Sequence, residues 1–485
     1  MKLKKLFEGV EVLSGEVPDI EVKNIVFDAD RVKKGDVFIC MKGASSDGHN
    51  FAKLASENGA VCVVAERSVG VQEEVFVKSS RKALARLSAN LYGNPAKKLK
   101  LVGVTGTNGK TTTVSMISEI LKQNGHNVGI IGTPGASFNH QHIDTGLTTP
   151  DPPQLHKLFR DMVDGGVTHV VMEVSAHALA LDKLEGVMFD VGVLTNITQD
   201  HLDCFGDIDN YARAKLKFFT SQHVKAGLVN IDDDKTRELL KDIKVPYLTY
   251  GIENPSDHFA IDIENSFLGN HFTCNSVDDV ANVGMKLLGR FNVYNALAAI
   301  GACSFLRVKL SDMLYPLRHM DPVEGRFNIF DIGGVKVIID FAHTPDGLKN
   351  VLLSARELAE GKLLSLFGCG GNRDRGKRAK MGKISEEIAD YTIITSDNPR
   401  FEVPEEIIKE VVSGMSGQSH FCITDRKRAI GKALDMCGDG DVLVIAGKGG
   451  EKYQDIKGVK RKYSDFDTIR DYAKRKVLKE YVSDK

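Results

Sequence analysis

The sequence predicts an α/β protein with three domains, and three observations support this. Its length of 485 residues is about three times that of an ordinary domain, for which roughly 150 residues is usual. From residue 98 onward, short apolar runs alternate with stretches of helical spacing, a pattern typical of parallel sheets with crossover helices. Hydrophobic residues make up 42% and charged residues 27% of the chain, which is enough apolar material to build folded cores.

Charge and composition disfavour several classes of protein. A net charge of −1 gives no overall attraction to nucleic acid or to an acidic membrane. The apolar runs are too short to span a membrane, and the start of the chain lacks the apolar stretch of a signal peptide. The eight cysteines form no CxxC pair, so we interpret them as small buried hydrophobes in a reducing compartment. We expect a cytoplasmic monomer that neither binds nucleic acid nor inserts into a membrane.

The predicted N-terminal domain covers residues 1–97. The β-type runs IEVKNIVFD, KGDVFICMKG, AVCVVAE and EVFVKS surround a helical stretch near residues 51–57. The dipeptide Asn94-Pro95 then interrupts the pattern, as turn-forming residues do between domains. We therefore expect a small α/β domain that ends close to this point.

The predicted central domain, residues 98–320, opens with LKLVGVTG, a continuous apolar run that indicates a buried parallel strand. The spacing of Val114, Ile117, Ile120 and Leu121 predicts a helix over 111–124. Further strands are expected in NVGIIG, THVVMEVS, DVGVLTN and AGLVNID. After DPVEGRFNIF the alternation resumes in VKVIIDF, KLLSLFG, YTIITS and DVLVIAG, which predicts a Rossmann-like C-terminal domain over 321–485.

The stretch GVTGTNGKT, residues 103–111, joins the first central strand to the predicted helix. In that context backbone N–H groups and the helix N-terminus can hold a phosphate. Gly106 and Gly109 permit close approach, Lys110 adds a charge, and Thr111 can bind Mg²⁺. Val104 stands where the usual motif has its first glycine. A plain glycine turn is the alternative, and the missing N-K-x-D element disfavours a signalling GTPase.

Polar residues follow two other predicted strands. Glu173 ends THVVMEVS, and Asp200 with His201 follows VGVLTN. Because the carboxyl ends of parallel strands meet at one edge, these groups are expected beside the glycine loop, where a carboxylate suits Mg²⁺. Each signal alone is weak, since an Asp-His pair in a loop is more often structural. Lys215 and Lys217 lie on a predicted helix, and by themselves they indicate only a solvated face.

Taken together, the motifs resemble those of the Mur ligases, and within that family the MurE branch. The motifs, in chain order, are GVTGTNGKT, MEVSAHAL, TNITQDHLD, YARAK, GRFNVYNALAA, GRFN, IIDFAHTPDGL, FGCGGNRDRGKR, SDNPR and AGKGGEKYQ. The resemblance runs from about residue 20 to the end, and the unusual glycine loop is this family's own form. It implies a small N-terminal α/β UDP-binding domain, a central P-loop-type ATPase domain with a mainly parallel sheet, and a C-terminal Rossmann-like domain that binds an amino acid.

The resemblance implies an ATP-dependent, ADP-forming amide ligase of peptidoglycan precursor synthesis, and hence of cell-wall formation, cell shape and division. ATP would phosphorylate the D-Glu carboxylate of UDP-N-acetylmuramoyl-L-alanyl-D-glutamate, and an amino group of meso-diaminopimelate would attack the acyl phosphate. Phosphorylation supplies a leaving group, and cations offset the repulsion between two anions. The alternatives are addition of L-lysine, a modified acceptor, a folylpolyglutamate synthetase-like ligase, and a non-catalytic nucleotide-binding paralogue.

The resemblance also assigns roles to residues. The catalytic residues would be Lys110, Glu173, His201 and Lys215. Thr111 and Glu173 would bind one Mg²⁺, and Glu173, His201 and Lys215 a second, with Lys215 converted by CO₂ to N6-carboxylysine. ATP is expected at Gly106, Thr107, Asn108, Gly109, Lys110, Thr111, Thr112, Asn292, Asn295, Arg326, Asp340 and His343. The UDP precursor is expected at Ala29, Thr148, Thr149, Ser175 and Lys183, and the added amino acid at Arg373, Asp397, Asn398, Pro399, Arg400, Gly447 and Glu451.

Two regions bear on the choice of substrates. Arg400 in DNPR suits an amino acid with an additional carboxylate, because guanidinium binds carboxylate through two parallel hydrogen bonds; a simple turn around Pro399 is the alternative. Elsewhere the chain departs from the usual family residues, mostly on the UDP side: Ala29 and Asp30 replace Ser-Arg, Leu147 an asparagine, Ala176 a serine, Lys183 an arginine, and Gly450 a histidine. These departures affect the expected site of the UDP-linked acceptor more than the expected ATP site.

Overall fold

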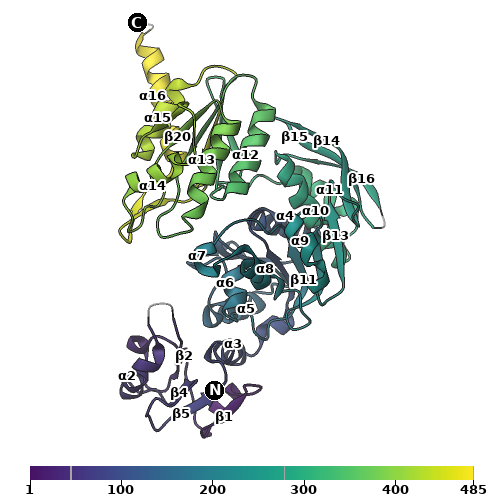
Figure 1. The fold of residues 1–485 in the computed structure, drawn as a ribbon. Coiled ribbons are helices and arrows are strands. Elements are labelled where there is room, and N and C mark those ends of the chain that lie inside the picture. The colour runs from purple at the N-terminus through teal and green to yellow at the C-terminus, as the bar shows by residue number, and fades with distance from the viewer. Residues whose placement is uncertain (44–45, 278, 484–485) are drawn as a thin grey trace.

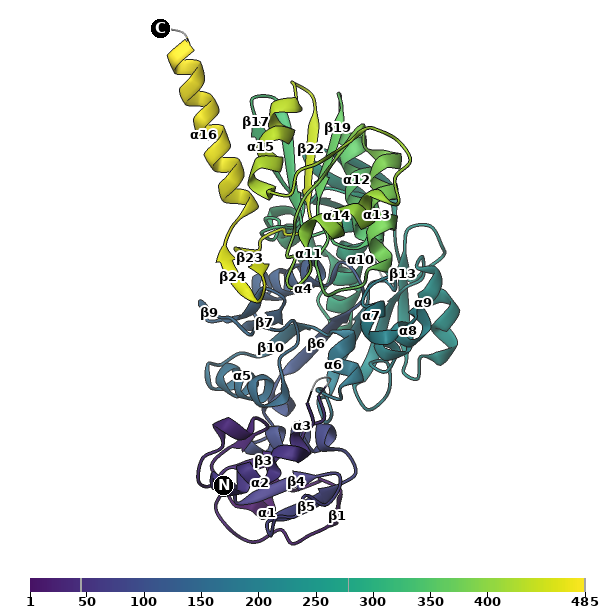
Figure 2. The ribbon, with the colours of Figure 1, turned by 60° about the vertical axis from the view of Figure 1, so that its left-hand side comes forward.

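The computed structural model describes residues 1–43, 46–277 and 279–483. The chain forms three successive groups of elements, with the N-terminus in the first and the last helix projecting from the third (Figures 1 and 2). The described residues contain a five-stranded, an eleven-stranded and a six-stranded sheet, and a two-stranded ribbon. The predicted α/β class, with three domains and mainly parallel sheets, is confirmed. The predicted domain boundaries at residues 97 and 320 fall between the sheets and stay a prediction.

The N-terminal sheet has the strand order β1-β5-β4-β3-β2, and only its β1–β5 pair is antiparallel. Helix α3 packs against α5 of the central domain and so connects the two domains. The strands are β1 Val12–Ser14, β2 Ile25–Val26, β3 Val37–Ile39, β4 Cys62–Ala65 and β5 Glu74–Val77, and the helices are α1 Leu3–Leu6, α2 Ala52–Glu57 and α3 Ser80–Leu91.

The central sheet has the order β16-β15-β14-β13-β12-β11-β6-β10-β7-β8-β9. Its middle, from β14 to β7, is parallel, and antiparallel strands extend both edges. The strands are β6 Lys100–Thr105, β7 Val128–Gly132, β8 Gly135–Phe138, β9 Gln141–Ile143, β10 His169–Glu173, β11 Phe189–Leu194, β12 Val224–Asn230, β13 Tyr247–Gly251, β14 His258–Ser266, β15 Gly269–Asn275 and β16 Val280–Met285. The helices are α4 Lys110–Gln123, α5 Pro152–Asp164, α6 Ala176–Ala180, α7 Leu202–Phe205, α8 Ile208–Leu216, α9 Asp234–Leu239, α10 Arg290–Phe305 and α11 Leu310–His319.

Strand β6 is apolar from Leu101 to Val104 because both faces of the sheet around it are covered. Val102 and Val104 belong to a cluster that includes apolar residues of α4, α10 and α11. Leu101, on the other face, packs in a second cluster with residues of α5, α6 and α8. A strand covered on both sides needs no polar face, so the continuous apolar run was a correct indicator. It places the glycine loop at the carboxyl edge of the sheet, directly before α4.

The C-terminal sheet has the order β17-β18-β22-β19-β20-β21, with an antiparallel β17–β18 pair and parallel pairs elsewhere. Its strands are β17 Asn328–Ile332, β18 Val335–Asp340, β19 Leu363–Phe367, β20 Tyr391–Ile394, β21 His420–Cys422 and β22 Val442–Ala446; β23 Tyr453–Ile456 and β24 Val459–Lys462 form the ribbon. The helices are α12 Pro345–Leu358, α13 Gly376–Ile388, α14 Pro404–Val412, α15 Arg426–Met436 and α16 Asp465–Ser483.

Two further expectations concern exposure. Within the described ranges, no helix combines the length and apolar character that a membrane crossing requires. The interpretation of all eight cysteines as buried hydrophobes is wrong for part of the set, because Cys204 and Cys422 are exposed and Cys437 is half-buried. Cys204 lies in the short helix α7, and Cys422 ends the edge strand β21.

Candidate active site

A cavity of about 710 Å³ lies between the central and C-terminal domains. It is bounded by the glycine loop, the ends of β10 and β11, the start of α10, and loops of the C-terminal domain. Most of the predicted site residues line this one cavity. These are Gly106, Thr107, Asn108, Gly109, Lys110, Thr111, Thr112, Thr148, Glu173, Ser175, His201, Lys215, Asn292, Asn295, Arg326, Asp340, His343, Arg373, Asp397, Asn398, Arg400, Gly447 and Glu451. Ala29, Thr149, Lys183 and Pro399 lie outside the cavity lining.

The glycine loop is held by the strand beside it. Thr107 N donates to Asn196 O, and Asn108 N donates to Asn196 Oδ1, each at 2.9 Å. Glycine is needed at position 106, where φ is +145° and a Cβ would lie 1.8 Å from Thr195 Oγ1. At Gly109, with φ +83°, a Cβ would lie 2.4 Å from Asn295 Oδ1. The loop therefore has the fixed backbone that phosphate binding requires.

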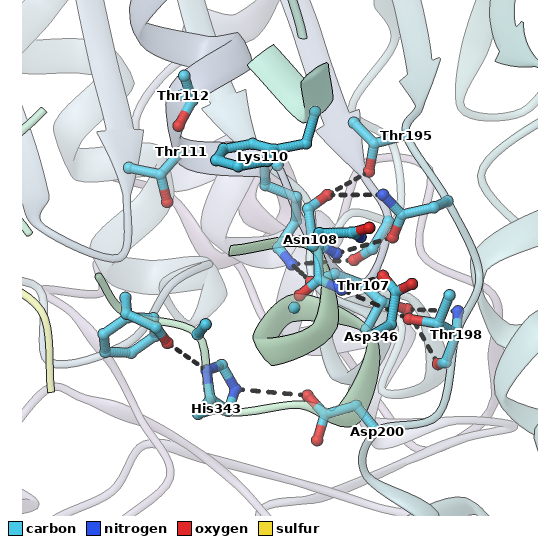
Figure 3. Close-up of a pocket in the computed structure, with 18 of the residues that line it drawn as sticks. Thr107, Asn108, Lys110, Thr111, Thr112, Thr195, Thr198, Asp200, His343 and Asp346 are labelled. Carbon is cyan, nitrogen blue, oxygen red and sulfur yellow. Dashed lines mark hydrogen bonds and ion pairs between the residues drawn. The ribbon is translucent and has the colours of Figure 1, made fainter. Parts of the chain in front are cut away.

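Lys110 points back into its own loop (Figure 3). Its ammonium donates to the carbonyl oxygens of Gly106 and Thr107, both at 2.9 Å. Burial lowers the pKa of Lys110, although Glu173 and Asp200 act in the opposite direction. An anion that enters the loop would offer this cation better partners than two neutral carbonyls.

Glu173, at the end of β10, accepts hydrogen bonds on both carboxylate oxygens. The Thr111 hydroxyl and the Thr133 N–H each lie 2.9 Å from Oε1, and the Thr133 hydroxyl lies 3.1 Å from Oε2. Thr133 follows strand β7 and was missed from the sequence, although the end of a parallel strand is a place to look. Carboxylate and hydroxyl oxygens are ligands that Mg²⁺ accepts.

The protein groups alone do not form a complete metal cage. Among the described residues, no cluster of three or more His, Cys, Asp or Glu side chains could hold a metal ion. Mg²⁺ keeps several waters and is commonly bound by one or two carboxylates together with substrate phosphates. Thr111 and Glu173 fit such a partial site, so a magnesium ion here would depend on the nucleotide for its remaining ligands.

Asp200 is buried at the seam between the two domains. His343 Nε2 lies 3.6 Å from Asp200 Oδ2 (Figure 3). His201 Nε2 lies 3.4 Å from the same oxygen, and Lys377 Nζ lies 3.5 Å from Oδ1. Burial alone would raise the pKa of Asp200, but His343, Lys377 and His201 hold it well below its usual range. For His201, burial dominates and lowers the pKa to about 4, so this imidazole is neutral at pH 7.

Lys215, on α8, is buried, which the sequence alone did not indicate. Its amino group donates to Gly106 O at 2.7 Å and lies 4.4 Å from the centre of the Tyr211 ring. Burial, followed by repulsion from Lys110, holds the pKa of Lys215 well below its usual value. Lys217, two residues on, instead pairs with Asp182 outside the cavity.

Three contacts join the glycine loop to the C-terminal domain. Asn108 Nδ2 donates to Asp346 Oδ2 at 3.0 Å, and the Thr344 hydroxyl donates to Asn108 Oδ1 at 3.2 Å (Figure 3). Arg326 Nη2 donates to Thr111 Oγ1 at 3.2 Å. Residues more than 200 positions apart thus meet at the phosphate loop, and two of the partners, Thr344 and Asp346, were not predicted.

The residues expected near the adenine and ribose form two groups. Asn292 Nδ2 donates to Leu288 O, and Asn295 Nδ2 donates to Asn292 Oδ1. They lie within α10 rather than at its cap, which is Gly289. Asp340 accepts from the N–H groups of Phe327 and Ala342, and burial raises its pKa although Arg326 opposes this.

The part of the cavity lining that comes from the C-terminal domain includes the residues expected to bind an amino acid. Arg400 Nη1 donates to Gly371 O at 2.7 Å, and Arg373 Nη1 to Asn372 O at 3.2 Å. Glu451 Oε2 accepts from Asn398 Nδ2 at 2.9 Å and from Lys448 Nζ at 2.8 Å. Lys448 is fully buried and was not predicted. Burial and the charge of Arg373 lower the pKa of Arg400.

The residues expected on the UDP side are dispersed. Thr149 braces the end of β10 through Glu173 O and Ser175 N, and Ser175 caps α6 by accepting from Ala178 N. Lys183 pairs with Asp151 at 2.8 Å. Ala29 is buried in an apolar cluster of the N-terminal domain. Only Thr148 and Ser175 of this group reach the cavity.

The comparisons with known proteins cover nearly the whole chain. Residues 21–93 match the "Mur ligase family, catalytic domain", residues 104–303 the "Mur ligase middle domain", and residues 325–449 the "Mur ligase, glutamate ligase domain". A curated protein of Clostridium tetani, named UDP-N-acetylmuramoyl-L-alanyl-D-glutamate--2,6-diaminopimelate ligase, is 41% identical over the full length of both chains. The chain belongs to the Mur ligase family.

Other Mur ligases show the same similarity. A protein of the same name from Bacillus cereus is 42% identical over 90% of this chain and 91% of its own. A solved structure with that name superposes with a TM-score of 0.70 and 30% identity, covering 98% of this chain and 99% of the other. A MurF ligase from Thermotoga maritima in complex with ADP has a TM-score of 0.64 at 20% identity, over 95% and 99% of the chains, and that likeness shows the fold alone.

Proposed function

We propose that this Mur ligase uses ATP to join meso-diaminopimelate to UDP-N-acetylmuramoyl-L-alanyl-D-glutamate in peptidoglycan precursor synthesis. The observation that carries the proposal is that one cavity is lined both by the glycine loop and by Arg373 and Arg400. The two curated relatives cited above bear the name of this activity, and this chain matches them over 91–100% of their length. A cytoplasmic location is part of the same proposal.

The proposed reaction has two steps. The D-Glu carboxylate takes the γ-phosphoryl group of ATP, which leaves ADP and an acyl phosphate; a neutral amine then forms the amide and releases phosphate. Lys110 would leave the Gly106 and Thr107 carbonyls for the phosphate oxygens, where a fixed cation offsets repulsion between two anions. Bound Mg²⁺, held through Thr111, Glu173, His201 and a carbamylated Lys215, would neutralise phosphate charge.

At the amino-acid end, the proposal assigns carboxylate binding to the two arginines. Arg400 and Arg373 present guanidinium groups from two loops, and neither has an ion pair with the nearby Glu402. The carboxylates of Asp397, Asp455 and Glu451 already act on Arg400 from a distance, and a substrate carboxylate would add a direct charged partner for the guanidinium groups. Glu451 is partly neutralised by Lys448, and its second oxygen is proposed to accept from the distant ammonium of the substrate.

The test is phosphate release from ATP in the presence of the UDP-dipeptide, with meso-diaminopimelate and L-lysine assayed in parallel. We expect turnover with meso-diaminopimelate only. Turnover with lysine alone would retain the ligase and overturn the assignment of the amino acid. Absence of turnover with both would overturn the proposed acceptor and direct attention to Ala29, Leu147 and Lys183.

Replacing Arg400 with methionine tests the role of its guanidinium. We expect the KM for meso-diaminopimelate to rise about 10²-fold, as is usual when one partner of a buried charge pair is removed. The KM for ATP should stay within about twofold, because the substitution removes only amino-acid binding. An unchanged KM for meso-diaminopimelate would contradict the assignment.

A further inference from the structure

Two loops that belong to different strand–helix units carry the arginines at the amino-acid end of the cavity. Arg373 lies between β19 and α13, and Arg400 between β20 and α14. Each cation opposes the other, since the charge of Arg373 is one of the causes that lower the pKa of Arg400. A pair of like charges held close together for one ligand needs a device that resists their separation.

The loops touch backbone to backbone. Gly371 N donates to Asn398 O at 2.9 Å. A Cβ at Gly371 would lie 1.9 Å from Pro399 O, so only glycine permits this approach. Asn372 N donates to Glu402 Oε1, and Phe401 N donates to Asn372 Oδ1 at 3.1 Å. These contacts fix the two loops relative to each other along a shared line of hydrogen bonds, called the seam below.

Arg378 lies beneath the seam and is completely buried. Its Nη1 and Nη2 donate to the two oxygens of Glu402 at 2.8 and 2.9 Å. Nη2 also donates to Gly370 O at 3.1 Å, and Nη1 to Glu410 Oε2 at 2.9 Å. One guanidinium thus contacts the loop of Arg373 through Gly370, the loop of Arg400 through Glu402, and helix α14 through Glu410.

The charges in this network balance among themselves. Arg378 and Arg375 pair with Glu402 and Glu410, and the hydrogen bond from Arg378 is the largest cause that lowers the pKa of Glu402. Neither Arg378 nor these carboxylates line the cavity. The network consequently leaves the charges of Arg373 and Arg400 available to a substrate.

We propose that Arg378 and Glu402 form a positioning pair that fixes the separation of Arg373 and Arg400 and so sets the affinity for the carboxylate-bearing amino acid. This inference rests on the proposed function of those two arginines. A paired guanidinium fork holds a fixed geometry that a lysine ammonium cannot reproduce. Displacement of a binding group by about 1 Å can cost a large factor in activity.

The test compares Arg378→Lys, Glu402→Gln and the double variant. We expect each single variant to raise the KM for meso-diaminopimelate about tenfold, while the KM values for ATP and the UDP-dipeptide stay within about twofold. The double variant should be no worse than either single variant, because both remove one interaction. Arg356→Lys is the control, since Arg356 pairs with Asp390 in the same domain away from the cavity.

Three outcomes would overturn the proposal: an unchanged KM for meso-diaminopimelate in folded Arg378→Lys, an equal rise in all three KM values, or additive effects in the double variant. If Arg378→Lys does not fold, Asn372→Gly decides, because Asn372 is exposed and has φ +51°, which suits glycine. It removes one bond across the seam and should raise the same KM about threefold. Absence of wild-type turnover with meso-diaminopimelate would instead refute the proposed function, and the comparison would then be made with L-lysine.

Discussion

Replacing Lys110 with methionine should reduce ATP-driven turnover by about 10³-fold, or about 4 kcal/mol in the activation free energy. The cause is the loss of a fixed cation that would offset the repulsion between the γ-phosphate of ATP and the carboxylate that attacks it. Methionine keeps the length and apolar stem of lysine, so the loop itself should persist. Phosphate release at saturating ATP and UDP-dipeptide measures the effect. The control is Lys122→Met, an exposed lysine on the same helix α4, which should leave turnover unchanged.

The same variant makes a prediction about stability. Lys110 donates two hydrogen bonds to loop carbonyls, but burial lowers its pKa and so disfavours its charged form in the folded protein. These effects oppose each other, and we expect the unfolding free energy to change by no more than about 1 kcal/mol at pH 7. A large loss of stability would show that Lys110 holds the loop together, and the drop in turnover could then not be assigned to catalysis.

The contribution of Lys110 to the unfolding free energy should change with pH in one direction. At pH values below the pKa that Lys110 has in the folded protein, its amine is protonated in both the folded and the unfolded protein. The folded protein then carries the full free-energy cost of burying the charge. As pH rises past that value toward the unfolded value near 10.5, the unfolded state binds more protons, so the wild type gains stability. Relative to Lys110→Met, the wild type should therefore gain stability as pH rises from the folded pKa of Lys110 toward 10.5, as measured by denaturant unfolding at several pH values.

The sequence predicted structure correctly where neighbouring residues alone determine the conformation. The continuous apolar run of β6 required a sheet covered on both faces, and the glycines after it required a tight loop before a helix. Glu173 could be predicted because it ends a parallel strand that lies beside β6. These inferences need only the periodicity of strands and the shared edge of a parallel sheet.

Contacts between distant segments could not be predicted in this way. Nothing in the local pattern around Asp346 indicates that the start of α12 meets Asn108 of another domain. The stretch GGNRDRGKR contains three arginines, and their types do not reveal that Arg373 is exposed while Arg378 is fully buried. Likewise, the sequence does not distinguish Lys215 from Lys217. Only Lys215 is buried, because burial depends on which segments pack against the helix.

Replacing Lys215 with alanine should lower turnover by about 10³-fold, comparable to the loss of an electrostatic group at the reacting centre. Carbamylation requires an amine that gives up its proton readily and a site that excludes water, and the buried side chain of Lys215 fits both requirements. Burial keeps the pKa of Lys215 well below its usual value, and Lys110 adds to the effect. The neutral amine would add CO₂ and release one proton, which converts a cation into a carboxylate that suits Mg²⁺.

Lys217→Ala is the matched control, because Lys217 lies two residues away, outside the cavity, and pairs with Asp182. We expect it to keep turnover within about fivefold, since a partly exposed ion pair contributes little. A second measurement does not depend on activity: protein equilibrated with ¹³CO₂ should show a carbamate carbon signal that disappears in Lys215→Ala and persists in Lys217→Ala. Full turnover in Lys215→Ala would refute the role of this lysine. Reduced turnover without a carbamate signal in the wild type would retain the lysine and reject its modification, leaving the amine to act through its contact with Gly106.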